Sequence, residues 1–376
     1  MALFQWSSEQ REEAFKLAKL KNSYLDRDIF IGKRYDDEMF WVRLQPFLLR
    51  YGYKLRPRYQ PDWTPSWFKL SSLEPAIKNV YDFEDALPLA RSKLMDATRQ
   101  HDGAKVVMKI VDTSAEEIQI IRYLTSPELL RDPRNRTVPL LDVLHLPDND
   151  SQALIVMPQL LQFDRLPFRR VGEIFEAIYQ YLQASALLMN GLEFMHEHHI
   201  SHRDASYFNL MMDASKIVPR GFHYFHETTH DGLNREFEWL QRWSVRPVQY
   251  YFIDFDISHR YLTSKDVKEM SRLGQDKSVP EYLRPGPYDP FKADIYQLGN
   301  TLLKTIKKYN PKGLESLLAL GEAMTSSIPE DRPSPAAALQ SLDEIDRKLL
   351  ERRIWKPTES WRNRLMIRFN RMNPII

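Results

Sequence analysis

The apolar residues between positions 90 and 160 occur in short runs that are separated by turn residues. One turn is Asp102-Gly103, and the run from Val106 to Val111 that follows it is apolar except for Lys109. Short apolar runs bounded by turn residues predict β-strands. The strands expected from this pattern are 94–99, 104–111 and 152–158.

In other parts of the chain the apolar residues recur close to every 3.6 positions, which is the period of an α-helix. The longest such stretch is 173–199, where the periodic residues are Ile178, Leu182, Leu188, Leu192 and Met195. One long helix is therefore expected there. A buried strand is expected over 248–253, and the chain after residue 290 is expected to be mainly helical.

Two shorter helices are also expected. The first covers residues 8–20, with Ala14, Leu17 and Leu20 on one side. The second covers residues 114–124, where Ser114 and Glu117 have the spacing of a capping box.

This order of elements predicts an α+β fold with two lobes. Residues 81–160 are expected to form a small β-rich lobe, and 161–350 a larger, mainly helical lobe with an insertion at 214–247. Residues 1–80 form an N-terminal extension, and 351–376 a C-terminal tail. Within the extension, residues 54–67 are rich in proline, arginine and aromatic residues, which indicates a segment wrapped over a surface. That segment is either packed on the chain itself or a docking site for a peptide.

Composition narrows the possible functions. The 376 residues include 53 basic and 51 acidic side chains, a formal net charge of +2, which gives no general attraction to nucleic acid. The chain has no cysteine, so disulfides, thiolate nucleophiles and cysteine zinc sites are excluded, and an intracellular location is expected. The first 21 residues do not have the apolar core of a signal peptide. No apolar run approaches 20 residues, so no membrane insertion is expected.

Three polar sites have the residue types that phosphoryl transfer needs. Lys109 lies inside an apolar strand, where it either reaches water from an edge or pairs with Glu117 to hold nucleotide phosphates. In the loop from His202 to Asn209, Asp204 supplies a carboxylate that can orient an attacking hydroxyl, and Asn209 an amide oxygen for a metal. Asp254 follows a buried strand and either holds Mg²⁺ or ends the strand in a turn.

Taken together, His202-Arg203-Asp204 with Asn209 and Asp254-Phe255-Asp256 resemble the eukaryotic protein-kinase family over roughly residues 90–345. In detail, these stretches resemble a branch that is common in mushroom-forming fungi. The resemblance implies a two-lobed kinase fold that uses ATP and Mg²⁺ and phosphorylates a protein substrate. It implies Asp204 as the catalytic base, Lys109 with Glu117 as phosphate-positioning residues, and Asn209 and Asp254 as metal ligands.

The resemblance extends to residues outside these loops. Met157 corresponds to the residue at the back of the adenine pocket, and the backbone of Pro158 and Leu160 to the groups that meet the adenine edge. Val279-Pro280-Glu281 resembles the end of the activation segment, and Arg332 the arginine that pairs with its glutamate. The helix that begins near Asp294 resembles the buried helix that anchors the catalytic loop.

Four departures from the family pattern lower the expected activity. No glycine occurs in 87–100, where a glycine-rich loop would cover the phosphates. Ser206 stands where serine/threonine kinases have a lysine, and Asp256 where the metal loop has a glycine. The fourth departure is the insertion at 214–247. The expected function is a protein kinase for serine or threonine, and the alternatives are a pseudokinase that binds nucleotide or acts as a scaffold and a kinase for small molecules.

The remaining features have two interpretations each. In the insertion, His223, His226 and His230 with Glu227 are either solvated loop residues or a metal site, and Trp239 and Trp243 share a helix spacing. Arg203 is a candidate receiver for a phosphate on Thr263, Ser264, Ser271 or Ser278. The residues of 362–376 form either a loosely packed terminus or a membrane-surface segment. The sequence does not determine the oligomeric state.

Overall fold

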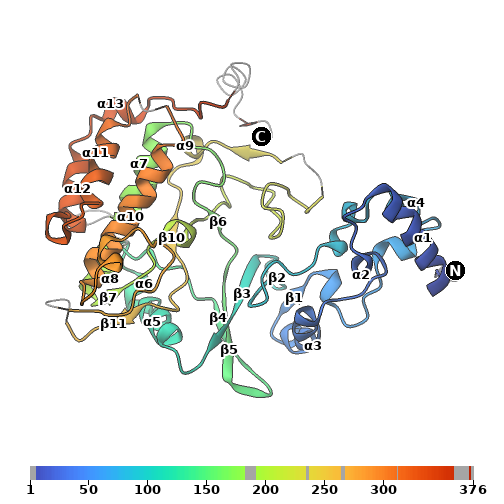
Figure 1. The fold of residues 1–376 in the computed structure, drawn as a ribbon. Helices are drawn as coiled ribbons and strands as arrows, with labels where there is room; N and C mark the ends of the chain where they lie inside the picture. Colours follow the sequence, from blue (N-terminus) through green and yellow to red (C-terminus); the bar gives the residue numbers. More distant parts are fainter. Residues whose placement is uncertain are drawn as a thin grey trace.

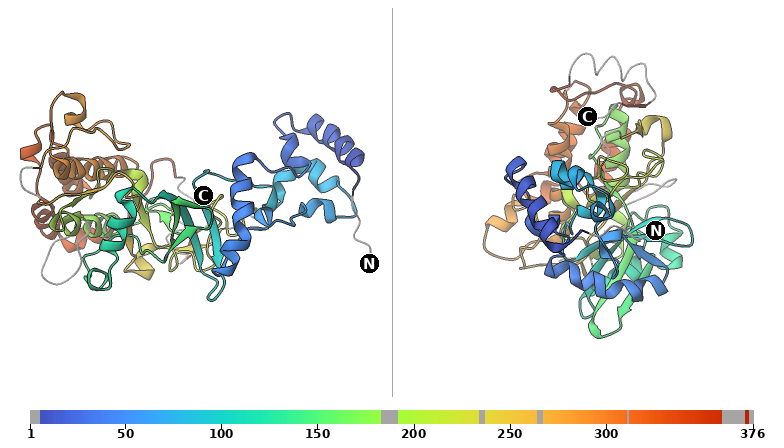
Figure 2. Two further views of the ribbon diagram at one scale, coloured as in Figure 1. Left: turned by 90° about the horizontal axis from the view of Figure 1, so that it is seen from below. Right: turned by 90° about the vertical axis from the view of Figure 1, so that its right-hand side faces the viewer.

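The computed structural model describes residues 6–182, 192–233, 237–263, 267–310, 312–359 and 372–373. Within these residues the protein is an α+β structure, as expected. Its largest sheet lies between a set of N-terminal helices and a set of C-terminal helices, which are at opposite ends of the molecule in two perpendicular views (Figures 1 and 2).

The main sheet has five antiparallel strands in the order β1-β2-β3-β5-β4. The strands predicted from the short apolar runs are confirmed, although two of them begin or end a few residues away. The five strands are β1 (Tyr53–Leu55), β2 (Leu94–Arg99), β3 (Lys105–Asp112), β4 (Asp142–Leu146) and β5 (Asn149–Pro158).

The two faces of this sheet pack against different elements because side chains alternate along each strand. Met108 and Val156 point toward α3 (Asp36–Arg50), where they meet the buried Trp41 and Leu48. Residues on the opposite face join the large core of the helical part. Burial on both faces fixes the strand register, because a shift by one residue would exchange the two sets of side chains.

The N-terminal helices enclose a separate small core. Helix α1 (Ser8–Lys21) begins at a capping box formed by Ser7 and Gln10. It packs on α4 (Glu74–Asn79) through Ala14 and Ala18, both of which are buried. The helix expected over 8–20 is confirmed, and of the residues expected on one of its sides Ala14 is buried, whereas Leu17 is 50% and Leu20 85% exposed.

The segment at 54–67 is packed against its own chain. It begins in β1 at the edge of the sheet and continues into the 3-10 turn Pro57–Tyr59. Arg58, Tyr59 and Trp67 are completely buried. Tyr59 joins the core of the main sheet and Trp67 that of the N-terminal helices, whereas Lys54, Pro57, Pro61 and Asp62 are exposed.

The helical part contains most of the stretch expected as one long helix. Helices α7 (Val171–Leu182) and α8 (Leu192–Glu197) form its described ends, whereas Leu188 lies outside the described residues. The expected helical region after residue 290 is confirmed. Its helices are α10 (Pro290–Ile306), α11 (Glu315–Met324), α12 (Pro335–Asp343) and α13 (Arg347–Leu350).

The helix expected over 114–124 is α5 (Glu116–Leu124), but its predicted capping box is wrong. The residue that precedes the helix is Ala115, and the Ser114 hydroxyl donates instead to Asp112 Oδ1 at 2.7 Å. Serine and aspartate often form such local turns, which compete with helix capping. Glu117 is thereby free to point away from the helix start.

Small sheets connect the loops of the helical part. Strand β8 (Leu210–Met212) lies between β6 (Leu161–Gln162) and β10 (Tyr250–Phe252), and β7 (Ile200–Ser201) pairs with β11 (His259–Arg260). Two further short helices are α2 (Arg27–Phe30) and α6 (Pro127–Leu130). Among the described residues, none of the helices has the length and apolar character needed to cross a lipid bilayer.

The insertion at 214–247 contains β9 (Trp239–Leu240) and α9 (Arg242–Val245). The two tryptophans of the insertion do not share one helix, because Trp239 lies in β9, where it is buried in the large core, and Trp243 lies in α9. Strand β12 (Met372–Asn373) of the tail pairs antiparallel with β9 of the insertion. The other residues of 362–376 lie outside the described residues.

Candidate active site

Side chains of α10 hold the loop that carries Asp204. The buried Asp294 accepts the backbone N–H groups of His202 and Arg203 at 2.9 and 2.7 Å. One turn further along α10, Gln297 accepts the N–H of Ala205 at 2.9 Å and donates to the carbonyl of Arg203 at 3.1 Å. These bonds satisfy backbone groups that the loop itself leaves unpaired. They also stabilise Arg203 in the left-handed region, at φ 64°.

Strand pairing brings the two expected metal ligands to the same edge. Strands β8 and β10 are antiparallel, with Leu210 opposite Phe252. Asn209 precedes the first of these residues, and its carbonyl accepts the N–H of Ile253 at 3.1 Å. Asp254 is therefore the next residue along and turns sharply out of the strand at φ 68°.

Lys109 connects strand β3 of the main sheet to Asp254. Its ammonium group donates to Glu117 Oε1 at 2.6 Å and to Asp254 Oδ1 at 2.5 Å. The Lys109 side chain is 14% exposed and that of Glu117 is 3% exposed, so the interaction is largely shielded from water. Burial alone would lower the pKa of Lys109, but the two carboxylates outweigh it and the pKa lies above its usual value. The lysine is an internal charge bridge and not a residue that reaches water from a sheet edge.

Asp204 lies beside Asn209 and accepts four hydrogen bonds at its carboxylate. Oδ1 accepts the hydroxyl of Ser206 at 2.8 Å and the backbone N–H of Gln275 at 2.9 Å. Oδ2 accepts the side-chain amides of Asn209 at 2.9 Å and Gln275 at 3.1 Å. The Asn209 amide nitrogen also donates to the Asp204 carbonyl at 2.9 Å. With its nitrogen fixed in this way, the Asn209 side chain directs its oxygen away from Asp204.

A further carboxylate, Asp256, follows the predicted metal ligand Asp254 by two residues. Burial raises the pKa of Asp256 first, and the negative charges of Asp254 and Asp204 raise it further. Lys109 acts in the opposite direction. Because Asp256 responds to both Asp204 and Asp254, it lies within electrostatic reach of the loop and of the metal-ligand edge.

The residues expected at the adenine lie on the link between the main sheet and the helical part. Met157 and Leu160 are each 8% exposed and belong to the large core, and Pro158 pairs with Val106 in the sheet. Between them, Gln159 donates its side-chain amide to the carbonyl of Phe222 in the insertion at 3.0 Å. The structure brings these residues together at the end of β5.

The predicted pair of Glu281 and Arg332 is present. Arg332 Nη1 and Nη2 bind the two carboxylate oxygens of Glu281 at 2.7 and 2.6 Å. Arg203, the candidate phosphate receiver, instead contacts Glu269 Oε2 at 3.5 Å through Nη2. Of the hydroxyls considered for that role, Ser271 donates to Glu269 Oε1, whereas Ser264 lies outside the described residues.

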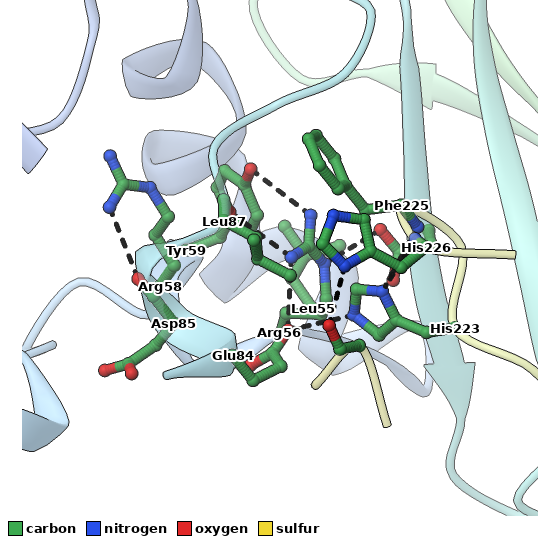
Figure 3. Close-up of polar contacts among 12 residues, drawn as sticks. Leu55, Arg56, Arg58, Tyr59, Glu84, Asp85, Leu87, His223, Phe225 and His226 are labelled. Carbon is green, nitrogen blue, oxygen red and sulfur yellow. Dashed lines mark hydrogen bonds and ion pairs between the residues drawn. The ribbon is translucent and has the colours of Figure 1, made fainter. Parts of the chain in front are cut away.

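The stretch 87–100, which has no glycine, covers the end of a long connection and most of strand β2. Strands β1 and β2 are connected by residues 56–93, a long connection that contains α4 and is fixed at both ends. Arg56 binds Glu84 at 3.1 Å and Asp96 of β2 at 3.0 Å, and Glu84 also contacts His223 of the insertion at 3.3 Å (Figure 3). Burial raises the pKa of Glu84. The His223 hydrogen bond and the Arg56 charge lower it by more, so the pKa lies below its usual value. The connection and the insertion are therefore linked by the contact between Glu84 and His223.

The histidines of the insertion bind separate partners. His226 Nδ1 contacts the Gly232 carbonyl at 2.7 Å, and His230 Nδ1 the Gly221 carbonyl at 2.6 Å. Glu227 pairs with Arg165 at 3.1 Å. In the part of the chain that the structure describes, no group of three or more His, Asp or Glu side chains is arranged to hold a metal ion. These contacts do not support the metal-site interpretation of the insertion.

A magnesium ion needs fewer protein ligands than a cluster of three side chains. It is commonly bound by one or two carboxylates together with substrate phosphates and waters. The outward-directed oxygen of Asn209 and the partly exposed carboxylate of Asp254 are ligands of the type that Mg²⁺ prefers. This donor set fits a nucleotide-bound Mg²⁺ better than an isolated metal ion.

Sequence comparison adds no identification. No family model matches the chain, and no curated protein matches it.

Sequence reasoning did not find Gln275 or the hydrogen bond from Ser206 to Asp204. Gln275 lies 71 residues from Asp204 along the chain, in a segment without regular periodicity. Its only sequence signal is the neighbouring Gly274, whose positive φ of 88° marks a tight approach of the backbone. A residue whose role depends on such a distant contact leaves no local pattern.

Proposed function

We propose that this protein is an ATP- and Mg²⁺-dependent protein kinase with a two-lobed kinase fold, which transfers the γ-phosphate to serine or threonine hydroxyls. The observation that supports this proposal most directly is the Lys109 bridge to Glu117 and Asp254. A lysine on a strand paired to a helix glutamate, with an aspartate for magnesium, is the arrangement that kinases need before phosphoryl transfer.

Each predicted residue has a physical role in this reaction. Lys109, oriented by Glu117, binds the α- and β-phosphates, and Met157 with the backbone of Pro158 and Leu160 meets the adenine. Asn209 and Asp254 hold Mg²⁺, which neutralises the charge that develops on the phosphate oxygens. Asp204 orients the substrate hydroxyl for in-line attack and accepts its proton.

The departures at Ser206 and at the connection 56–93 point to slow turnover. A cationic donor that contacts the transferred group contributes about 10²-fold in rate, by analogy with oxyanion-hole donors. Ser206 supplies a hydroxyl and no positive charge, and it is occupied with Asp204. Catalysis by this site is therefore expected to be slower than that of a kinase with the lysine.

The test is transfer of the γ-phosphate from ATP to a broad panel of serine- and threonine-containing proteins and peptides. Wild type should transfer phosphate in the presence of Mg²⁺ or Mn²⁺, and Asp204→Asn should reduce transfer to background. Small hydroxyl compounds in the same panel examine the small-molecule kinase alternative. Equal, background-level signals for wild type and Asp204→Asn on every substrate would refute the proposal.

A second candidate is a nucleotide-binding or scaffold module without turnover. The observation that favours it is the carboxylate of Asp204, which already accepts four internal hydrogen bonds. Thermal unfolding with and without Mg²⁺-ATP separates the candidates. A rise in the melting temperature without any phosphate transfer would favour the second candidate. If Mg²⁺-ATP does not raise the melting temperature, nucleotide binding by either candidate is weakened.

A further inference from the structure

The segment that follows Glu269 reaches back to the candidate catalytic base. We infer that Gln275 is a gate on the acceptor side of the site, which occupies the place of the substrate hydroxyl until a substrate displaces it. This inference rests on the proposed kinase function. It concerns the contact between Gln275 and Asp204, which we call the Gln275 cap.

The acceptor sites of the Asp204 carboxylate are all in use. An ionised carboxylate offers about four lone-pair sites. At Asp204 the donors are the Ser206 hydroxyl, the Asn209 amide, and both the backbone N–H and the side-chain amide of Gln275, all within 3.1 Å. A substrate hydroxyl must donate to this carboxylate in order to be oriented by it. One of the four present donors has to leave before that bond can form.

Of the donors to Asp204, the side-chain amide of Gln275 is the one that leaves most easily. Ser206 is 4% and Asn209 3% exposed, and Asn209 is further fixed by its bond to the Asp204 carbonyl. Gln275 is exposed, and its side chain has rotatable bonds that allow the amide to swing into solvent. Its amide bond to Oδ2 is also the longest of the four, at 3.1 Å. The Gln275 side chain is therefore the donor that costs least to displace.

The backbone beneath the Gln275 cap is fixed. A Cβ on Gly274 would lie 2.6 Å from the Arg203 carbonyl, so this part of the segment is pressed against the catalytic loop. Two residues later, Asp276 is buried and accepts the Asn300 side-chain amide at 2.6 Å. With the backbone held on both sides, the gate opens by rotation of one side chain and not by unfolding of the segment.

Opening exchanges one hydrogen bond for another. The Gln275 amide leaves Asp204 Oδ2 and becomes solvated, and the substrate O–H donates to the same oxygen. The backbone N–H of Gln275 stays on Oδ1 and keeps the carboxylate oriented. The cap therefore competes with the protein substrate and not with ATP, whose expected contacts are at Lys109 and Met157.

The test compares steady-state kinetics of wild type, Gln275→Ala and Gln275→Asn. Both variants keep the backbone donor, and the shorter asparagine side chain does not reach Oδ2. We expect kcat/KM for the protein substrate to rise about five-fold, the factor that corresponds to one net hydrogen bond, with the KM for ATP unchanged. Lys277→Ala is the matched control, because Lys277 is exposed in the same segment and donates to the Arg272 carbonyl.

The possible outcomes separate the gate from the proposed function. A rise for both Gln275 variants and none for Lys277→Ala supports the gate. An unchanged or lower kcat/KM for Gln275→Ala overturns it while leaving the kinase function intact, and a decrease would show that Gln275 holds Asp204 in place for catalysis. Background transfer by wild type and every variant overturns the kinase function and the gate together.

Discussion

Arg332 and Glu281 are joined by two parallel hydrogen bonds, Nη1 to Oε1 at 2.7 Å and Nη2 to Oε2 at 2.6 Å. The Arg332 side chain is completely buried, and its remaining donors bind the carbonyls of Ser326 and Lys292. The pair therefore ties the end of the segment that carries Gln275 to the loop before α12. Such a two-bonded geometry favours arginine over lysine.

Removal of Arg332 is expected to destabilise the protein strongly. Arg332→Ala would leave Glu281 and two backbone carbonyls without their donor, and loss of one partner of a buried ion pair costs about 3–5 kcal/mol. The free energy of unfolding from urea denaturation measures this loss. Arg284→Ala, at an exposed arginine of the same segment, is the control and should change the free energy of unfolding by less than about 0.5 kcal/mol. A similar small effect for Arg332→Ala would contradict the structural role of the pair.

A second buried pair, Arg58 with Glu38, is expected to be replaceable by apolar residues. Both side chains are completely buried, and Arg58 Nη2 lies 2.8 Å from Glu38 Oε2. Arg58→Met should cost about 3–5 kcal/mol because it leaves Glu38 as an unpaired buried charge. The double variant Arg58→Met with Glu38→Leu should regain part of this loss, because no charge is then buried. Urea denaturation of the two single variants and the double variant measures the coupling, and additive losses would show that the residues act independently.

Much of the main sheet follows from the sequence because its signals are local. The apolar runs around Lys109 and the turn at Asp102-Gly103 predict a hairpin, and β2 and β3 are present at those positions. The pairing of Lys109 with Glu117 could be anticipated as one of two alternatives. Its bond to Asp254 connects residues 145 positions apart, and only the folded chain brings them together.

Other features had no local signal, or a misleading one. Ser114 and Glu117 have the capping-box spacing, yet the Ser114 hydroxyl binds Asp112 and the helix starts later. Leu17 and Leu20 fit a helical period, but the residues of that helix that pack in the neighbouring core are Ala14, Phe15 and Ala18. Local propensity is a weak guide wherever tertiary contacts decide which group a side chain meets.

Substitution of Lys109 is expected to weaken nucleotide binding if the proposed function is correct. Lys109→Met removes the charge that would meet the phosphates and leaves Glu117 and Asp254 without their shared partner. The rise in melting temperature on addition of Mg²⁺-ATP should therefore be smaller than for wild type. Lys105→Met is the control, since Lys105 lies on the same strand and bonds Thr98 at 2.8 Å on the exposed surface. Equal nucleotide-induced shifts for Lys109→Met and wild type would argue against a phosphate contact at this lysine.

Glu176 is expected to make stability depend on pH. It lies on α7 and accepts the N–H of Val248 at 3.2 Å. Burial raises its pKa to about 7, with a further contribution from Glu173, whereas the Val248 bond acts in the opposite direction. An unfolded glutamate has a pKa near 4.3, so the folded state binds the proton more tightly. The resulting stabilisation is complete below about pH 4 and is lost as the pH rises to about 7.

The variant Glu176→Gln tests this dependence, because glutamine stays neutral and its oxygen can still accept the Val248 N–H. Relative to wild type, the variant should gain about 1–3 kcal/mol in free energy of unfolding between pH 5 and pH 8, since only the wild type must then carry a buried charge. Urea denaturation at the two pH values measures the difference. Glu128→Gln, at an exposed position on α6, should show no such change. If the difference between Glu176→Gln and wild type is the same at both pH values, Glu176 titrates like an exposed glutamate and the pKa shift is absent.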